Sequence, residues 1–147
     1  MKSKQILDVH QMHHLQELGL ELKETILYWA RCVDNNPRAA THYGKWVLIK
    51  GNNAQTVGLM HWEFIPAYTL QDVLDALSAE INSGTRRFWL RIDFYDECLY
   101  YYYDDYKFVE HRKKVIGYDG MDGLIDAAYE LLCWCIENKF VETNKNE

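Results

Sequence analysis

The sequence lacks any long hydrophobic run. None of its stretches approaches the roughly 18 consecutive apolar residues that a membrane-spanning helix needs. The first eight residues of the 147 also lack the continuous apolar segment of a secretory signal. We therefore expect a cytoplasmic protein with no membrane partner.

An excess of positive charge is also missing. The chain has 16 Lys and Arg against 22 Asp and Glu, which gives a formal net charge of −6 and a calculated pI of about 5.5. Nonspecific nucleic-acid binding depends on basic residues that neutralise phosphates. We therefore expect no nucleic-acid partner and an acidic surface that keeps the protein soluble.

Recognisable catalytic motifs are absent as well. The sequence has no glycine-rich phosphate loop, no Gly-x-Ser-x-Gly nucleophile turn, no His-Glu-x-x-His metal motif and no Cys-x-x-Cys pair. We assign no catalytic residue and expect no cofactor. The prediction is a non-enzymatic protein.

The chain has four cysteines, an even number that permits two disulfides. A chain of this length buries roughly two-thirds of its unfolded surface, so it folds without cross-links. In a reducing compartment free thiols are then the better expectation. The four residues are Cys32, Cys98, Cys133 and Cys135.

The order of helix and strand signals favours the α+β class. We expect one globular domain over residues 1–141, followed by a disordered tail over 142–147. The domain should hold a mainly antiparallel sheet of about four to six strands with three helices. The helices are expected at approximately 8–18, 70–81 and 123–137.

The middle helix has the clearest local signal. Thr69 stands at the N-cap position and Asp72 three residues later can complete a capping box. Apolar residues then recur at helical spacing as far as Ile81, and Asn82 to Gly84 should end the helix.

The last helix has apolar residues around most of its circumference, so we expect it in the core with Asp122 as its N-cap. A narrow polar stripe of Asp126, Glu130, Cys133 and Glu137 should face solvent. Cys133 and Cys135 point about 200° apart on a helix, so they cannot share a metal or form an unstrained disulfide. Nearby carboxylates should raise the Cys133 pKa, and both cysteines are interpreted as structural.

The strand signals are β-branched and aromatic runs bounded by turn residues. Strict alternation predicts a hairpin near residues 88–103. Residues 57–64 fit an edge strand or an ordered loop, and the charged segment 104–114 fits a loop or a frayed strand end. The other strands are expected at 25–33, 45–50 and 115–118.

A tyrosine-rich strand in that hairpin is the candidate binding surface. Alternation places Tyr100 and Tyr102 on one face, with Asp104 and Asp105 as an acidic flank. Exposed tyrosines provide contact area at little entropic cost, which suits protein recognition. The alternative is that helices cover both faces of the strand.

Three histidines near the start are weak candidates for a metal site. His10 lies three and four residues before His13 and His14, so two imidazoles could share an ion on a helix. No zinc signature accompanies them, and solvated histidines are the simpler interpretation. Further ligands would have to come from Cys32, His42, His61 or His111.

Three segments carry a resemblance to a protein family: residues 11–19, 65–74 and 124–138. With these segments the chain resembles a group of small uncharacterised proteins from prophages and other mobile elements of Bacteroides-type gut bacteria. In that group the position after Asn138 is typically glycine, whereas here it is Lys139. The resemblance implies a mobile-element setting and a cytoplasmic location, and it transfers no functional residue.

Together these features predict a non-enzymatic accessory protein of a mobile element that acts through protein–protein contacts. Self-association through the tyrosine-rich sheet is one form of this. A second hypothesis is an acidic inhibitor that imitates nucleic acid, based on the −6 charge and the Asp104–Asp105 pair. A third is a small metal-dependent enzyme that uses the histidines.

Overall fold

The computed structural model describes residues 4–32, 45–51 and 62–143. Within these ranges the α-helices are α1 (Val9–Glu17), α3 (Leu70–Ala76) and α4 (Leu124–Glu137), with a 3-10 turn η2 (Met121–Gly123) before α4. The strands are β1 (Leu27–Cys32), β2 (Trp46–Lys50), β3 (Trp62–Pro66), β4 (Glu80–Ser83), β5 (Arg86–Asp93), β6 (Cys98–Asp104) and β7 (Glu110–Gly117).

The described strands form two antiparallel sheets, one ordered β2-β1-β3 and the other β4-β5-β6-β7. The predicted α+β class, the antiparallel pairing and the three helices are confirmed, although the strands are divided between two sheets rather than one. Of the two options for residues 57–64, the edge strand is confirmed over residues 62–64, because these belong to β3 at the edge of its sheet. Residues 57–61 lie outside the described part.

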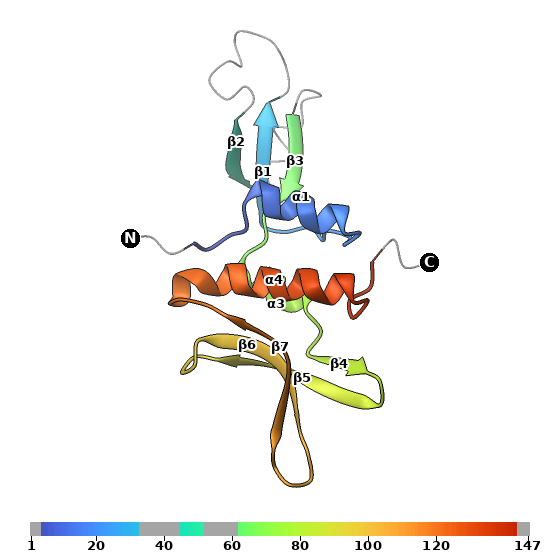
Figure 1. Cartoon of the computed structure of the whole chain (residues 1–147). Coiled ribbons are helices and arrows are strands. Elements are labelled where there is room, and N and C mark those ends of the chain that lie inside the picture. Colours follow the sequence, from blue (N-terminus) through green and yellow to red (C-terminus); the bar gives the residue numbers. More distant parts are fainter. Residues whose placement is uncertain (1–3, 33–44, 52–61, 144–147) are drawn as a thin grey trace.

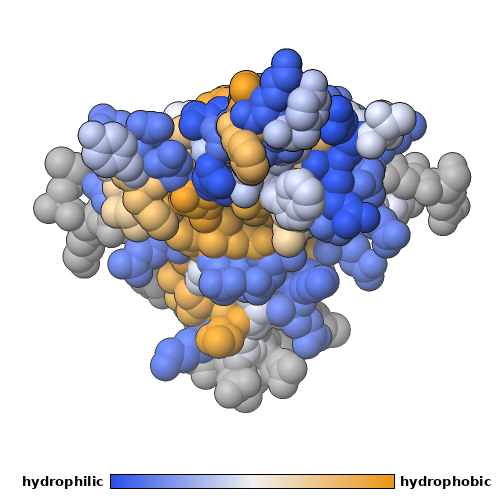
Figure 2. Space-filling view, turned by 90° about the horizontal axis from the view of Figure 1, so that it is seen from below, coloured by the Kyte–Doolittle hydropathy of each residue, from blue (hydrophilic) through white to orange (hydrophobic). Residues whose placement is uncertain are grey.

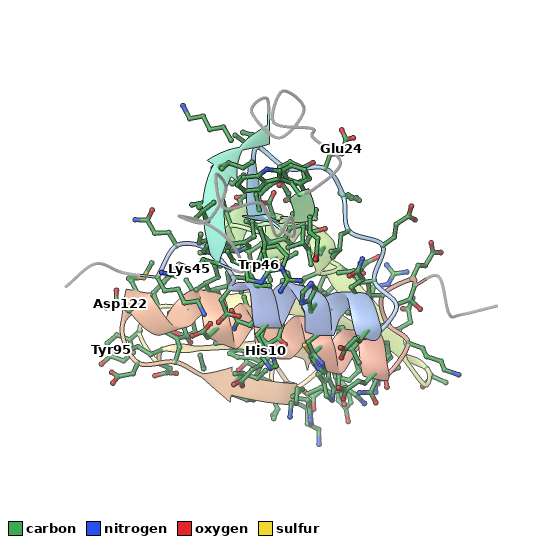
Figure 3. All side chains as sticks on the ribbon, turned by 90° about the horizontal axis from the view of Figure 1, so that it is seen from above. His10, Glu24, Lys45, Trp46, Tyr95 and Asp122 are labelled. Carbon is green, nitrogen blue, oxygen red and sulfur yellow. The ribbon has the colours of Figure 1, made fainter. Side chains whose placement is uncertain are left out.

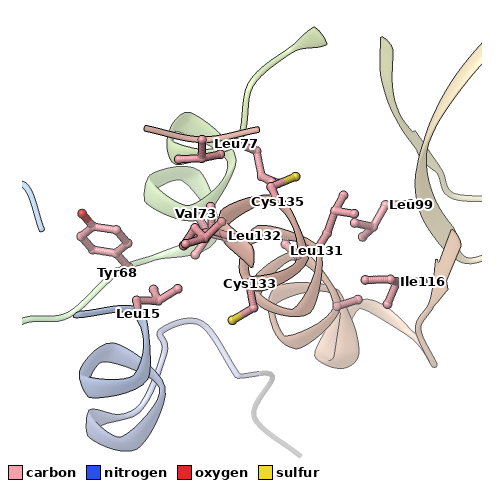
Figure 4. Packing of buried hydrophobic residues seen from close by; sticks show 14 of the residues in the cluster. Leu15, Tyr68, Val73, Leu77, Leu99, Ile116, Leu131, Leu132, Cys133 and Cys135 are labelled. Atoms are coloured by element: carbon pink, nitrogen blue, oxygen red, sulfur yellow. The ribbon is translucent and has the colours of Figure 1, made fainter. Parts of the chain in front are cut away.

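Helix α4 is the centre of the molecule (Figure 1). The three-stranded sheet and α1 lie on one side of it, the four-stranded sheet lies on the other, and α3 runs beside it. Leu131 packs toward Leu99 and Ile116 of the sheet, while Leu132 packs toward Val73 of α3 (Figure 4). The prediction of a helix packed on several sides is confirmed.

The predicted solvent stripe of α4 is wrong in part. Cys133 is buried because α1 packs over this side of the helix, with Leu15 nearby (Figure 4). Asp126 accepts hydrogen bonds from Lys4 Nζ at 2.8 Å and from Gln11 Nε2 at 2.9 Å. Two residues of the stripe therefore attach the N-terminal segment to α4.

Asp126 should make stability depend on pH. Burial raises the pKa of its carboxyl, but the hydrogen bonds from Lys4 and Gln11 outweigh burial and hold the pKa below its ordinary value. A depressed pKa contributes stability above the unfolded value, and this is lost as pH falls through the folded value. We expect melting temperatures to fall below about pH 4, and Asp126→Asn to reduce that fall. The exposed Asp119→Asn is the control, and equal falls in both variants would contradict the assignment.

The middle helix begins as predicted but ends early. Asp72 N–H donates to Thr69 Oγ1 and Thr69 N–H donates to Asp72 Oδ2, so the capping box is present. The predicted range 70–81 is wrong, because α3 ends at Ala76 and Ile81 pairs with Phe88 in the β4–β5 hairpin. Pairing with β5 outweighs the helical spacing of the apolar residues there.

Two further boundaries differ from prediction. Asp122 is not an N-cap, since the 3-10 turn η2 precedes α4 and Gly123 provides no side-chain cap. The charged segment is a loop only over 105–109, because Glu110 to Lys114 belong to β7. Long charged side chains suit an edge strand, where they discourage pairing with other chains.

The end of α4 keeps the geometry of a glycine cap without glycine. Lys139 has a φ of 64°, its N–H donates to Ile136 O at 3.1 Å, and Phe140 N–H donates to Cys135 O at 2.8 Å. These two bonds form a Schellman motif. The rings of Phe140 and Trp134, 5.2 Å apart, add the apolar contact that accompanies it.

Lys139→Gly should stabilise the protein. A left-handed conformation costs a residue with a Cβ about 1–2 kcal/mol, and the greater freedom of glycine in the unfolded chain offsets part of the gain. We expect the free energy of unfolding to rise by about 0.5–1 kcal/mol in urea titrations. Glu137→Gly, inside the last helical turn, is the matched control and should destabilise by up to about 1 kcal/mol. A loss of stability in Lys139→Gly would contradict this reading of the cap.

Cys98, Cys133 and Cys135 are free thiols, as predicted, and all three are buried; the side chain of Cys32 lies outside the described part. Burial raises the pKa of Cys133 to about 11, with smaller contributions from Glu137 and Glu130, and it raises that of Cys135 to about 11. Such thiols stay protonated near neutral pH. Across the described ranges, no helix is both long enough and apolar enough to cross a bilayer.

Candidate functional site

The β6–β7 hairpin projects from the molecule on the side away from α4 (Figure 1). One face of its sheet packs on α4 through Leu99 and Ile116, and no described helix covers the other. The view from below shows apolar side chains in the middle of this side, framed by polar ones (Figure 2). This face and the hairpin tip are therefore where an external partner has access.

The expectation that Tyr100 is exposed is wrong. Its side chain is 0 % exposed although it lies on the face without a helix. The guanidinium of Arg112 lies 4.1 Å from the centre of the Tyr100 ring, and Arg91 lies 3.9 Å from that of Tyr102. Arginine stems and cation–π contacts cover these rings, and Tyr102 is left half-buried.

Glu110 holds both guanidinium groups in place. Its Oε1 lies 2.5 Å from Arg91 Nη1 and its Oε2 lies 2.6 Å from Arg112 Nε. The three residues come from β5 and β7, so they span β6 above the tyrosines. The charges are therefore largely compensated within the sheet, and the tyrosine face is a closed network rather than an open aromatic platform.

Asp105 organises the hairpin loop. It accepts hydrogen bonds from Lys107 N–H at 2.8 Å and Val109 N–H at 3.0 Å, and it pairs with His111 Nε2 at 3.0 Å. The bond to His111, followed by those to the backbone, lowers the Asp105 pKa. The structure thus places Asp105 as a loop-holding residue, whereas Asp104 is exposed at the end of β6.

The most exposed apolar side chains of the hairpin lie at its tip. Tyr106 is 85 % exposed, Phe108 is 90 % exposed and Val109 is 51 % exposed. Phe108 has a φ of 62°, and its N–H donates to Asp105 O at 2.8 Å, so the loop is held while its apolar side chains face outward. We refer to Tyr106, Phe108 and Val109 as the hairpin tip.

The hairpin tip was missed from the sequence. The available signal was the apolar pattern Tyr106-x-Phe108-Val109 inside a segment of charged residues. The charge of residues 104–114 predicts a loop or a frayed strand end and does not single out these side chains. An aromatic pair within a polar turn is a useful sign of a contact loop.

The N-terminal histidines are held by different neighbours. His13 meets the edge of Trp46 at 5.8 Å, and His14 meets that of Tyr129 at 6.4 Å, while His10 is exposed on α1. Within residues 4–32, 45–51 and 62–143, no three His, Cys, Asp or Glu side chains are grouped to hold a metal ion. The described geometry does not bring the three candidates together at one point.

Comparison with known proteins identifies no relative of this chain, so a functional proposal has to rest on the geometry of the structure. Searches against protein-family models, curated proteins and solved structures found no match to this chain. No activity can therefore be carried over from a relative. The hairpin tip, with its exposed aromatic residues on an ordered loop, is the site on which a functional proposal rests.

Proposed function

We propose that this protein is a non-enzymatic binding protein that acts through protein–protein contact, with the hairpin tip as its anchor. The observation that carries the proposal is the display of Tyr106 and Phe108 on a loop that Asp105 holds. Aromatic side chains that enter a pocket commonly provide a large part of the binding energy at interfaces. Holding them beforehand lowers the entropy cost of binding.

The partner that fits this tip is a protein with an apolar cleft. The residues beside the tip carry both signs, with Asp104 and Glu110 against Lys107 and Arg112. An anionic membrane or a nucleic acid attracts a surface that is predominantly basic, which this one is not. An apolar cleft needs no such charge, so it accounts for both the exposed rings and the balanced flanks.

Self-association is one form of this proposal. The four-stranded sheet ends at β7, whose outward edge could pair with a second copy. The exposed Lys114 and the irregular β6–β7 pairing between Leu99 and Tyr101 make this edge unsuited to strand addition. Self-association through this hairpin would therefore use its tip rather than the β7 edge.

We place the protein in the cytoplasm as an accessory factor of a mobile element, a setting that rests on the family resemblance.

The two other hypotheses, a nucleic-acid mimic and a metal-dependent enzyme, have less support from the structure than a binding protein. Carboxylates of Glu110 and Asp105 are paired with arginine, histidine and backbone groups, whereas a nucleic-acid mimic needs them free. His13 packs against Trp46 and His14 against Tyr129, which supports packing roles for these two histidines over metal ligation.

Site-specific cross-linking from the tip tests this function. A photoreactive amino acid at Lys107 should capture a defined partner in source cells, and the double variant Tyr106→Ser with Phe108→Ser should remove that product. For a purified partner we expect affinity to fall on the order of a hundredfold. Ile26→Ser is the matched control, because Ile26 is 78 % exposed at the bend just before β1, outside the hairpin.

Two results would count against the proposal. One is a cross-linked partner that is retained when both tip residues are serine. The other is equal loss in the Ile26→Ser control, which would indicate general surface hydrophobicity. Sedimentation of the wild type and the double variant separates self-association from binding to another protein.

A further inference from the structure

A groove of about 1010 Å³ lies on a different part of the molecule from the hairpin tip. One wall is the extended segment Leu20–Thr25, the second is α3 with the residues after it, and the third is the stretch that follows α4. Figure 3 shows Glu24 on the side of the molecule away from Tyr95 and Asp122. The lining contains no residue of β6, β7 or the loop between them, so the groove is separate from the hairpin tip.

The walls of the groove are held by contacts within the fold. Lys23 N–H donates to the hydroxyl of the buried Tyr68 at 2.9 Å, which fixes the extended segment. Ser78 Oγ donates to Phe140 O at 3.5 Å, which joins the end of α3 to the segment after α4. The Tyr68 hydroxyl points away from the core (Figure 4). Sites held in this way need little rearrangement to bind a ligand.

The floor of the groove is apolar. Leu20, Tyr68 and Val141 are buried residues whose surfaces close its base, and Leu22 and Ala76 are half-buried beside them. An apolar base can receive the aliphatic stem of a long side chain. The floor therefore supplies a contact that a row of solvated carboxylates alone would not.

The rim of the groove is strongly acidic. Its lining has five carboxylates and one basic side chain, Lys23. Asp72 is engaged in the α3 capping box and Asp75 accepts from Gln71 Nε2 at 2.7 Å, while the rest are exposed. The carboxylates are Glu21, Glu24, Asp72, Asp75 and Glu142. This concentration contrasts with the four-stranded sheet, where arginines compensate the carboxylates.

We propose that this groove docks an extended, lysine- and arginine-rich segment of a partner protein. The aliphatic stems lie along the apolar floor and the cationic groups meet the acidic rim, so both parts of the lining are used. The potential of the rim repels nucleic acids and anionic lipids, which leaves a basic polypeptide as the complementary macromolecule. The two sites thus take chemically different ligands.

The probe for this site is a short synthetic peptide in which lysine and arginine alternate with alanine and valine. A peptide with glutamate in place of each basic residue is its counterpart. We expect amide shifts in NMR spectra of the full chain at residues 20–25, 72–78 and 141–143. Raised salt should weaken binding, and the acidic peptide should not bind.

Charge reversal locates the binding. Glu24→Lys with Asp75→Lys should lower affinity for the basic peptide by about tenfold or more in fluorescence anisotropy. Asp96→Lys with Asp119→Lys changes the net charge equally at exposed positions outside the lining, and should alter affinity less than about twofold. Circular dichroism and melting curves confirm that each variant is folded.

Three results would overturn the proposal. Equal weakening in both double variants would mean that the peptide senses only net charge. Amide shifts confined to the hairpin tip would place the peptide elsewhere. No binding by the folded wild type at low salt would leave the groove without the proposed ligand. The Tyr106→Ser, Phe108→Ser protein should bind the peptide normally, so the groove and the tip can fail separately.

Discussion

Leu132→Ala is expected to lower the free energy of unfolding by about 3 kcal/mol. Leu132 is 0 % exposed and packs toward α3 from the middle of α4, so alanine there leaves a cavity bordered by Val73 and its neighbours. Surrounding side chains can relax only partly into such a space. Urea titration followed by circular dichroism measures the loss.

Leu48→Ala is the matched control for this substitution. Leu48 is 42 % exposed in β2, so the same change of side chain should cost less than about 1 kcal/mol. Equal losses in the two variants would contradict the central place of α4. A small loss for both would indicate that the interior closes around the Leu132 cavity.

Tyr100→Ser is also expected to destabilise strongly, by about 3 kcal/mol. The ring is fully buried on the face that no described helix covers, under Arg91 and Arg112. Serine removes the surface on which Arg112 stacks and leaves the arginine stems without support. Thermal and urea unfolding should show the change, with a smaller effect for the half-buried Tyr102→Ser.

Tyr95→Ser provides the comparison for Tyr100→Ser. Tyr95 is 95 % exposed in the β5–β6 turn, and its replacement should change stability by less than about 0.5 kcal/mol. If Tyr100→Ser is as mild as Tyr95→Ser, the arginine cover is not tightly packed. The expected loss also means that lost binding in Tyr100→Ser would report unfolding rather than a contact.

The fold class followed from local signals that tertiary packing did not override. The Thr69–Asp72 capping box, the alternation in β5 and the all-round apolar character of α4 each identify an element without reference to the rest of the chain. The helical spacing of apolar residues gave a wrong prediction at the junction of α3 and β4. Ile81 fits a helical face, but its partner Phe88 on β5 places it in a strand.

Contacts between distant residues could not be read from the sequence. Cys133 was placed by angle in a polar stripe, yet its exposure depends on α1, which begins more than a hundred residues earlier. Alternation correctly predicts that Tyr100 and Tyr102 share a face of the sheet. The burial of Tyr100 depends on Arg91 and Arg112, which belong to other strands and cover it from above.

The candidate site shows the same limit. The sequence predicts Asp104 and Asp105 as an acidic flank, whereas the structure uses Asp105 to hold a loop and exposes Tyr106 and Phe108. The acidic groove joins residues 20–25 to residues 141–143, a combination that no local pattern indicates. Sites assembled from separate segments require the fold.

The position of α4 also bears on how the chain folds as it is synthesised. This helix completes the interior of both halves, yet it leaves the ribosome after all seven described strands. Until then the inner faces of β6 and β7, with Leu99 and Ile116, lack their cover. We infer that the two halves become stable together and late, so nascent chains that stop before Leu124 should be targets for chaperones and proteases.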